Sequence, residues 1–347
     1  MRLNVIESVA PERWDARLQA LGGTIYHSTT WARYVASANP NCKPCFFTWG
    51  SENGDAAGMA LGFLARSGRR WLAPFTGRLS LDSTPLVGPG EETALADFLA
   101  AITGYAREMG CTEIEVGSSA SCRGGQELED LGFEITRRLE FVLDLQHTEE
   151  ELWQAMDPVR RQKIRKAVKQ GVVLRNLSGQ EGLAELRRLQ AESGQRILNR
   201  GGPDIGRRGA HPADPVLTLL QSGWGHLVGA VVGGEVVSAG LFTCFNELVY
   251  HTLSGHGRRA LETQAPTLLL WETIKRYQRE GARRFNLSGC KITAVQEGSP
   301  EHGVYVYKRD FGGERIDCAS GHKVLRRSAY KAVRFLKSLL DPHRQFK

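Results

Sequence analysis

Residues 226–254, HLVGAVVGGEVVSAGLFTCFNELVYHTLS, decide the fold of the second half of this chain. They contain three apolar runs, Leu227–Val232, Val236–Phe245 and Leu248–Ser254. The separators between these runs are Gly233-Gly234-Glu235 and Asn246-Glu247. Glycine and asparagine tolerate the positive φ angles of tight hairpin turns, so the stretch predicts three antiparallel strands in a meander.

A helix is predicted directly after the meander. Leu270, Ile274 and Tyr277 repeat at the three-to-four-residue spacing of a buried helical stripe. Pro266 suits the first turn of this helix, and Gly281 suits its end. The second half is therefore predicted to contain a three-stranded meander followed in sequence by one helix.

Residues 304–313, VYVYKRDFGG, predict a late strand that carries one cation. Because side chains alternate along a strand, Val304, Val306 and Lys308 would share one face. Burying a lone ammonium costs several kcal/mol unless an anion meets it, so Lys308 is expected either to form an internal salt bridge or to wait for a ligand. The other predicted elements here are the strands Arg284–Leu287 and Arg315–Ala319 and a turn at Gly312-Gly313.

The first half repeats this order of elements. Its predicted elements are the strands Phe46–Trp49, Ala57–Ala65 and Trp71–Ser80, a helix over Glu92–Met109, and a late strand at Leu139–Leu145. Residues 106–116, AREMGCTEIEV, align by eye with residues 278–287, QREGARRFNL, each as a helix end, a glycine and a short strand. This similarity predicts an internal duplication of one α/β unit, with domains at 1–145 and 146–347.

Composition and length indicate a globular protein of two domains. The chain has 347 residues, of which 41% are hydrophobic, and it exceeds the roughly 250–300 residues of a single core. The apolar runs fall short of a membrane helix and the N-terminus lacks a signal-peptide core, so we expect a cytoplasmic protein with no integral membrane segment. Seven scattered cysteines fit reduced thiols, and Cys42-Lys43-Pro44-Cys45 without a second ligand pair is a weak metal signal.

The net charge of +7 is concentrated in two stretches. Seven cations and no acid occur in residues 160–175, on a helix predicted over 158–170. A second basic helix is predicted over 323–340, with its apolar face packed on the protein. Charge runs are usually solvated helix faces, yet an acid-free run also suits a polyanionic partner such as RNA or a phosphorylated sugar.

Meander, helix, short strand and final hairpin form the order of the GNAT acyltransferase fold, and two such units in tandem resemble the FemAB family of aminoacyl-tRNA-dependent transferases. The residues that carry the resemblance are Tyr26-His27-Ser28 with Trp31, the basic helix Arg160–Val172, and Gly303–Gly313. The resemblance implies an α/β (α+β) fold of two tandem GNAT-like domains, each with a mixed, largely antiparallel twisted sheet flanked by helices. The first domain would be a degenerate scaffold on the acceptor side, and the second would be catalytic.

The same resemblance implies transfer of an aminoacyl group from tRNA to an amine of a peptidoglycan-precursor-like, peptide or sugar acceptor, which would be linked to a nucleotide in some cases. It assigns stabilisation of charge at the transfer step to Lys308, with Tyr307 beside it. The substrate-binding candidates are Tyr26, Ser28, Trp31, Arg33, Arg160, Lys163, Arg165, Lys166 and Arg258. Two departures concern the substrate: Tyr34-Val35-Ala36 leaves Arg33 in place of a family lysine, and a coiled-coil arm is missing from the sequence pattern.

The chemistry requires a cation or N–H donors at the carbonyl oxygen, which gains negative charge when an amine attacks. Lys308 meets that need, and the activated ester makes a protein nucleophile unnecessary. The candidate general bases are Glu247, His251, Glu262 and Asp310. His251, a lone strand histidine, also fits a purely structural role, and its spacing from His256 does not suit a metal, so no metal is expected.

The donor is expected to be aminoacyl-tRNA, and no further cofactor or obligate protein partner is expected. Acyl-CoA-dependent relatives hold pyrophosphate with a Q/R-x-x-G-x-G/A loop, whereas residues 255–262 here read GHGRRALE. The Gly88-Pro89-Gly90 loop is followed by two glutamates, which would repel phosphate. An acyl-CoA-dependent N-acyltransferase of a sugar, polysaccharide or peptide amine is the alternative, and a non-catalytic RNA-binding or glycan-binding duplicate is a second one.

Overall fold

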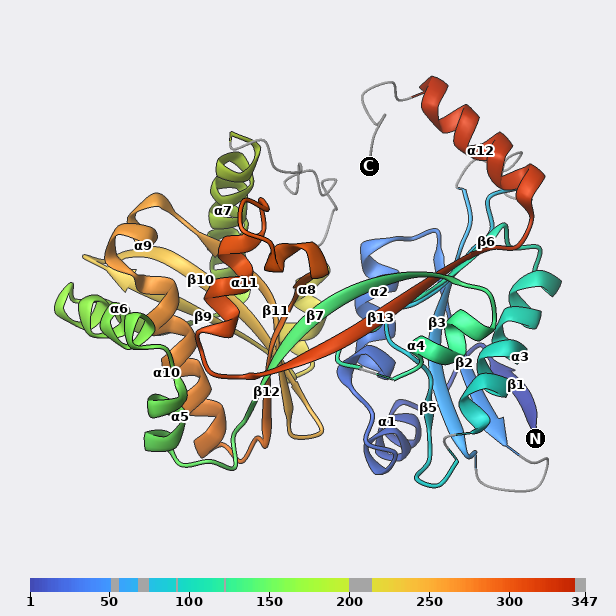
Figure 1. Ribbon diagram of the computed structural model, residues 1–347, viewed down its shortest axis with the longest axis horizontal. Helices are drawn as coiled ribbons and strands as arrows, with labels where there is room; N and C mark the ends of the chain where they lie inside the picture. Colours follow the sequence, from blue (N-terminus) through green and yellow to red (C-terminus); the bar gives the residue numbers. More distant parts are fainter. Residues whose placement is uncertain (51–55, 68–74, 92, 122, 200–213, 341–347) are drawn as a thin grey trace. The chain divides into compact units, whose positions relative to one another are not determined.

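The computed structural model in Figure 1 describes all residues except 51–55, 68–74, 92, 122, 200–213 and 341–347, and of residues 336–340 only the backbone. The chain divides into two units. The first unit comprises Met1–Arg137 together with Cys318–Lys347, and the second comprises Arg138–Asp317. Within the described residues, no helix is both long and apolar enough to cross a membrane.

The second unit contains a six-stranded sheet in the order β7-β12-β11-β10-β9-β8. The expected meander is confirmed, because β10 pairs antiparallel with both β9 and β11. β11 then pairs in parallel with β12, which pairs antiparallel with β7. The strands are β7 Glu134–Asp144, β8 Val173–Leu177, β9 Gly225–Val232, β10 Glu235–Phe245, β11 Leu248–His256 and β12 Arg284–Lys291.

Helices cover this sheet and complete its core. α10 buries the expected stripe of Leu270, Ile274 and Tyr277 and has Pro266 in its first turn. α10 packs against β9, β10 and α6, whereas α7 packs against β10 and β11. The helices are α5 Glu149–Ala155, α6 Pro158–Lys169, α7 Gly179–Leu198, α8 Val216–Gln221, α9 Arg258–Thr263, α10 Ala265–Arg279 and α11 His302–Arg309, with the 3₁₀ turn η3 Ile292–Val295.

The first unit has the same order of pairings. Its strands run in the order β1-β2-β3-β4-β6-β13, with β5 paired to β3. β4 and β6 pair in parallel, and the other pairs described for this unit are antiparallel. The strands are β1 Arg2–Ile6, β2 Cys42–Gly50, β3 Gly58–Ala65, β4 Arg78–Leu81, β5 Leu86–Val87, β6 Glu113–Val116 and β13 Glu314–Val324. The helices are α1 Pro11–Ala20, η1 Ile25–His27, α2 Thr29–Ala38, α3 Ala94–Glu108, α4 Gly125–Asp130 and α12 Arg327–Leu340.

The last strand of each repeat lies in the sheet of the other unit. β7 ends the first repeat in sequence, yet from Arg138 onward it belongs to the second unit, where it pairs with β12. β13 ends the second repeat, yet from Cys318 onward it belongs to the first unit, where it pairs with β6. The structure therefore does not divide at 145/146 as expected, because the repeats exchange their final strands.

The strand expected over residues 304–313 is wrong, because this stretch forms helix α11. Its β-branched and aromatic residues suggested a strand, but they also satisfy helical spacing. The Tyr307 ring contacts the Phe311 ring at a centroid distance of 5.4 Å, and Arg309 lies 5.6 Å from the Tyr305 ring, both four residues apart. Helix α11 ends at Arg309 with Asp310 as its C-cap, and Gly312, at φ +82°, lies in the turn that follows it.

Three further boundaries differ from the expected ones. The strand expected at Trp71–Ser80 is β4, Arg78–Leu81, and residues 71–74 and Glu92 lie outside the described part of the chain. The strand expected at Arg315–Ala319 extends to Val324, so the C-terminal helix begins at Arg327 rather than at 323. Of the apolar face expected for that helix, Leu325 packs against the core of the first unit and Ala332 is exposed, while the side chains of Leu336 and Leu340 lie outside the described residues.

Candidate active site

The parallel strands β11 and β12 pair only over the first part of their length. Their ladder joins Leu248–Tyr250 to Arg284–Asn286 and ends there. Both strands continue, because β11 stays paired with β10 as far as His256 and β12 stays paired with β7 as far as Lys291. This end of the ladder is where the candidate residues of the second unit meet.

Lys308 is held at this point by the backbone of β12. Its Nζ donates to the Gly289 carbonyl oxygen at 2.8 Å and lies 3.4 Å from Ser288 Oγ. Ser288 has φ +65°, an unusual conformation for a residue with a side chain, and its N–H donates to Asn286 Oδ1 at 2.7 Å. The β12–β7 register shifts between Asn286 and Gly289, so a β-bulge presents the carbonyl that holds the lysine.

Burial lowers the pKa of Lys308 to about 8. Cys290 and the carboxylates of Glu140 and Glu301 act against this lowering of the pKa, whereas the Arg138 guanidinium adds to it. Lys308 is partly buried and carries its charge below about pH 8. Lys308 is therefore a desolvated cation on a helix. The expectation that it continues a row of valines on a strand is wrong.

His251 lies on β11, immediately after the last residue of the parallel ladder. Burial first, and then the charge of Lys308, lower the pKa of His251 to about 3, so its ring stays neutral. The ring stacks on Phe242 at a centroid distance of 4.8 Å and hydrogen-bonds the Leu253 backbone. Nε2 is buried and has no hydrogen-bond partner within the described part of the chain. His251 thus offers one buried, unsatisfied ring nitrogen beside Lys308.

Asp310 and Arg160 form a buried clamp between α6 and α11. Arg160 Nη2 donates to Asp310 Oδ2 at 3.1 Å, and the two side chains are 5% and 8% exposed. The same guanidinium lies 4.6 Å from the Tyr307 ring, whose hydroxyl donates to the Pro266 carbonyl oxygen at 3.1 Å. Asp310 also accepts hydrogen bonds from Arg309. Asp310 and Arg160 are thus paired with each other, although Arg160 Nε is buried without a hydrogen-bond partner among the described residues. The roles expected for Asp310 as a general base and for Arg160 as a phosphate contact stay predictions.

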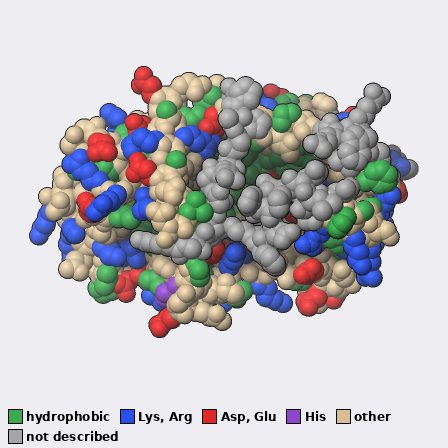
Figure 2. All heavy atoms as spheres, turned by 90° about the horizontal axis from the view of Figure 1, so that it is seen from above, with side chains coloured by type: hydrophobic (Ala, Val, Ile, Leu, Met, Phe, Trp, Pro, Cys, Tyr) green, Lys and Arg blue, Asp and Glu red, His purple; other side chains and the backbone are tan. Residues whose placement is uncertain are grey.

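The other cations of α6 divide into partly buried and exposed side chains. Lys163 is partly buried, and burial lowers its pKa. Arg165 and Lys166 are exposed, and the Arg165 guanidinium lies 5.5 Å from the Trp153 ring. Lys169 is also exposed. On the face shown in Figure 2, Lys and Arg side chains are scattered among Asp and Glu rather than gathered into one patch.

Three residues of the first motif are structural in the first unit. Ser28 is fully buried, caps α2 by accepting from the Trp31 N–H, and donates to the Ile25 carbonyl oxygen. The Trp31 indole N–H donates to Asp82 Oδ2 at 2.7 Å, and the Tyr26 ring is buried against Trp31. The substrate contacts expected for Tyr26, Ser28 and Trp31 stay predictions, and they would require these buried side chains to become accessible.

Arg33 is the exposed member of that motif. Its guanidinium donates to Thr30 Oγ1 at 3.2 Å, which leaves most of its N–H groups at the surface. Two base candidates lie in surface ion pairs instead, with Glu247 bound to Arg283 at 3.1 Å and Glu262 bound to Arg258 at 3.3 Å. Of the four base candidates, only His251 lies at the end of the β11–β12 ladder.

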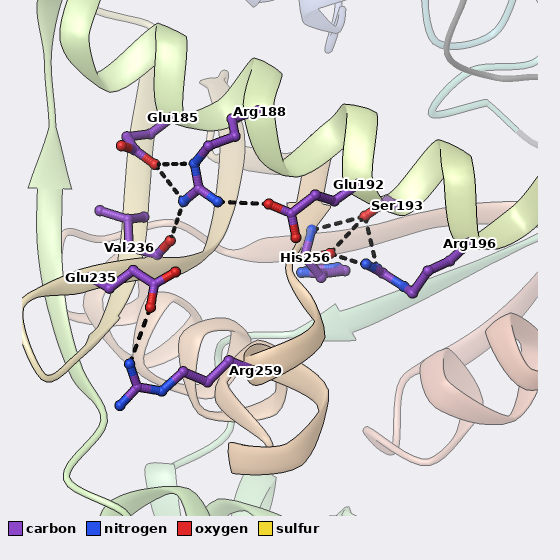
Figure 3. Close-up of polar contacts among 9 residues, drawn as sticks. All are labelled: Glu185, Arg188, Glu192, Ser193, Arg196, Glu235, Val236, His256 and Arg259. Carbon is purple, nitrogen blue, oxygen red and sulfur yellow. Dashed lines mark hydrogen bonds and ion pairs between the residues drawn. The ribbon is translucent and has the colours of Figure 1, made fainter.

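The start of α9 is crowded by acidic side chains. Gly257 caps this helix, and a Cβ placed on Gly257 would lie 3.1 Å from Glu192 Oε2. Figure 3 shows Glu192 paired with Arg188 and, nearby, Ser193 and Arg196 bound to the backbone of His256. A phosphate at this helix start would meet a carboxylate.

Sequence reasoning missed the buried polar group beside Lys308. Glu140 of β7 is 1% exposed and accepts from Tyr250 Oη at 2.9 Å and from Asn286 Nδ2 at 2.7 Å. Arg138 Nη2 lies 3.0 Å from its Oε1. The only signal was a glutamate between apolar residues in 139–145, LEFVLDL, and alternation alone places such a residue on a solvent face.

Comparisons with known proteins agree on the fold. Residues 159–309 match a family model described as an acetyltransferase (GNAT) domain. The crystal structure of FemX is similar with a TM-score of 0.74 at 14% identity, covering 95% of this chain and 99% of that chain. A search of the curated proteins found no match.

Two further solved structures share the arrangement over nearly the whole chain. L-PGS from Bacillus licheniformis has a TM-score of 0.56 at 14% identity, covering 96% of this chain and 97% of that chain. A tandem GNAT protein from the clavulanic acid biosynthesis pathway has a TM-score of 0.54 at 16% identity, covering 93% and 98%. The chain thus has the FemX-like tandem GNAT fold, α+β with mixed, mostly antiparallel sheets, as its sequence resemblance implied.

Proposed function

We propose that this protein is an acyltransferase that moves an aminoacyl group from charged tRNA onto an amine, with Lys308 at the transfer step. The observation that carries this proposal is the position of Lys308 at the end of the β11–β12 ladder. An ammonium has three N–H donors, and the bonds to Gly289 and Ser288 use two of them among the described residues. The third is free to donate to a carbonyl oxygen as negative charge develops there.

His251 supplies the second element of the proposed chemistry. The hydrogen bond to the Leu253 backbone fixes one ring nitrogen, and Nε2 keeps a lone pair for an incoming amine. Because burial holds its pKa near 3, His251 acts as a hydrogen-bond acceptor that orients the amine rather than as a strong base. Tyr307, packed on Arg160, holds the helix that carries Lys308.

An RNA-borne donor is supported by two features of the second unit. The exposed cations Arg165, Lys166 and Lys169 lie on α6 without an acid in that helix. Glu192 lies over the start of α9, where a CoA pyrophosphate would bind in acyl-CoA-dependent enzymes of this fold. The acceptor is an amine of a small peptide or sugar, such as a peptidoglycan-precursor-like molecule, and Arg33 is the first-motif residue exposed to meet it.

An acyl-CoA-dependent N-acyltransferase is the second candidate. The family model that matches residues 159–309 carries an acetyltransferase description, and the Arg258 side chain at the start of α9 is 90% exposed. Arg258 would then meet the phosphates of CoA from outside the helix. The two candidates differ in the donor and share the site at Lys308.

The test is a donor comparison with matched variants. Purified protein is given a mixture of tRNAs charged with radiolabelled amino acids, or labelled acyl-CoA, together with a panel of peptide and aminosugar acceptors. We expect label from tRNA on an acceptor, and loss of this transfer in Lys308→Ala but not in Lys323→Ala. Transfer only from acyl-CoA would establish the second candidate. RNA binding without transfer from either donor would make the protein a binding duplicate and refute the proposal.

A further inference from the structure

A buried polar group of the second unit that the proposed chemistry does not use is the carboxylate of Glu140. It is 1% exposed and has three polar partners, Tyr250, Asn286 and Arg138. Burying a carboxylate costs free energy that its hydrogen bonds must offset. The positions of its three partners indicate what the carboxylate does.

Tyr250 and Asn286 are the last residues paired in the β11–β12 ladder. Both donate to the same carboxylate, Tyr250 to Oε1 and Asn286 to Oε2. Glu140 therefore ties the two strands together at the residue pair after which they part.

Asn286 passes this constraint on to Lys308. Its Nδ2 donates to Glu140, and its Oδ1 accepts the N–H of Ser288, so the two bonds fix the orientation of the amide. Ser288 holds its positive φ, and Gly289 next to it presents the carbonyl oxygen that binds Lys308 Nζ. Two hydrogen bonds, the backbone of Ser288 and Gly289, and a third hydrogen bond thus connect Glu140 to the lysine.

Gly289 has no room for a side chain, because β7 lies directly against it. A Cβ on Gly289 would lie 2.4 Å from Arg138 Nη2 and 2.4 Å from the Leu139 carbonyl oxygen. Arg138 itself pairs with Glu140 at 3.0 Å. Arg138 and Leu139, which precede Glu140 on β7, therefore pack directly against the β-bulge at Gly289.

We propose that Glu140 is a positioning residue of the transfer site, which seats Lys308 by fixing the end of the β11–β12 ladder. Glu140 comes from the last strand of the first repeat, so the repeat without the lysine supplies the carboxylate that places it. Both repeats are then needed to build one site. The catalytic meaning of this inference rests on the proposed function, but the seating of Lys308 is measurable without any substrate.

The charge of Glu140 gives this role a measurable signature. The groups that face Lys308 are Cys290 on β12, Arg138 and Glu140 on β7, Glu301 before α11, and His251 on β11. Among them Glu140 is the buried anion, because the Glu301 side chain is 33% exposed and pairs with Lys291. Replacing Glu140 with a neutral residue lowers the pKa of Lys308 further, whereas replacing Glu301 has a smaller effect because water screens it.

The experiment measures the pKa of Lys308 in the full chain. The probe is reductive methylation with formaldehyde and a borohydride across a pH series, with the Lys308 peptide quantified by mass spectrometry. We expect Glu140→Gln to shift the titration of Lys308 to lower pH, and Tyr250→Phe, which keeps the carboxylate and its bond to Asn286 but loses one bond of the tie, to shift it less. Glu301→Gln and Thr252→Val, which breaks the hydrogen bond between Thr252 on β11 and Thr243 on β10, are the matched controls.

A parallel assay follows transfer from the mixture of charged tRNAs to a lysine-containing peptide. We expect Glu140→Gln to reduce turnover about 10–100-fold, the range for groups that orient a functional residue, and to move the alkaline limb of the pH profile to lower pH. If Glu140→Gln fails to fold, Asn286→Ala is used, and we expect faster methylation of Lys308 as it leaves its seat. A folded variant with unchanged Lys308 titration and turnover overturns the inference. A wild-type protein without transfer activity, combined with the Lys308 shift, refutes the proposed function alone.

Discussion

The two parallel strand pairs of this protein end differently. In the first unit, the β4–β6 ladder ends at Leu81–Val116, and hydrogen bonds continue beyond it from Gly117 N–H to Leu81 O at 2.6 Å and from Ser119 N–H to Asp82 O at 3.2 Å. In the second unit, the β11–β12 ladder ends at Tyr250–Asn286, and each strand goes on with its outer neighbour.

The helices that follow the two pairs differ in the same sense. α4 follows β6 and reads GQELED over residues 125–130, without a lysine or arginine. α11 follows β12 and carries Lys308 into the end of the ladder. Both units have the same order of elements. In the first unit hydrogen bonds continue past the end of the parallel ladder, whereas in the second unit the ladder ends beside the cation Lys308. The comparison teaches that the strand ends, rather than the strand order, distinguish the candidate site from its scaffold.

Removal of the Lys308 ammonium tests this difference between the two units with the largest expected effect. Lys308→Ala should lower turnover about 10²–10³-fold, the loss typical for one preorganised electrostatic donor. Lys323→Ala is the matched control, because Lys323 also bonds a backbone carbonyl, that of Leu131, but in the first unit. Equal losses in the two variants, measured under single-turnover conditions, would contradict the assignment of the site to the second unit.

The clamp between α6 and α11 should matter chiefly for stability. Asp310→Asn leaves the Arg160 guanidinium buried without its anion, so we expect the free energy of unfolding to fall by about 3 kcal/mol. Urea denaturation followed by circular dichroism measures this loss. An unchanged midpoint would contradict a stabilising clamp between Asp310 and Arg160.

The dependence of turnover on pH should follow the charge of Lys308. Its pKa is depressed to about 8 by burial, so the active ammonium is present below that pH and is lost as the pH rises through it. Turnover should therefore fall about tenfold per pH unit on the alkaline side. Lys308→Arg, which stays protonated, should lose this limb, and a profile flat to pH 10 in the wild type would contradict the role of the lysine.

Binding of RNA should depend on salt through the exposed cations of α6. Each phosphate contact contributes about 0.7–0.9 to the slope of log K against log salt concentration. Lys166→Ala combined with Lys169→Ala should therefore reduce the slope by about 1.4–1.8, whereas Lys275→Ala on α10, where the lysine pairs with two glutamates, should not change it. Fluorescence titration with tRNA measures this, and a slope that is the same in all variants would make α6 a solvated helix.

The first motif should show the smallest effect. Ser28→Ala removes the cap of α2, so we expect about 1 kcal/mol less stability and unchanged turnover. A thermal melt and the transfer assay check both expectations. A large loss of turnover at wild-type stability would show that the first motif does contact substrate.

Much of the fold was predictable because each repeat signals its elements locally. The meander over residues 227–254 and the α6 helix were confirmed, since turn residues and helical spacing fix them within short windows. The exchange of β7 and β13 was not predictable, because strand pairing across distant residues leaves no periodic mark in the chain.

The candidate site was predictable only in part. Lys308 stood out as a cation within an apolar run, although that run is a helix. Glu140 did not, because its burial depends on Tyr250 and Asn286, which are more than 100 residues away in sequence. The burial of Arg160 was missed for the same reason, since its partner Asp310 lies 150 residues further along the chain.

A structure with a bound donor analogue tests the central claim most directly. The ligand is an RNA acceptor stem that ends in a non-hydrolysable aminoacyl amide. We expect its carbonyl oxygen in the second unit, within about 3 Å of Lys308 Nζ, with the RNA backbone along the exposed cations of α6. A carbonyl bound in the first unit, or in the second unit away from Lys308, would contradict the account.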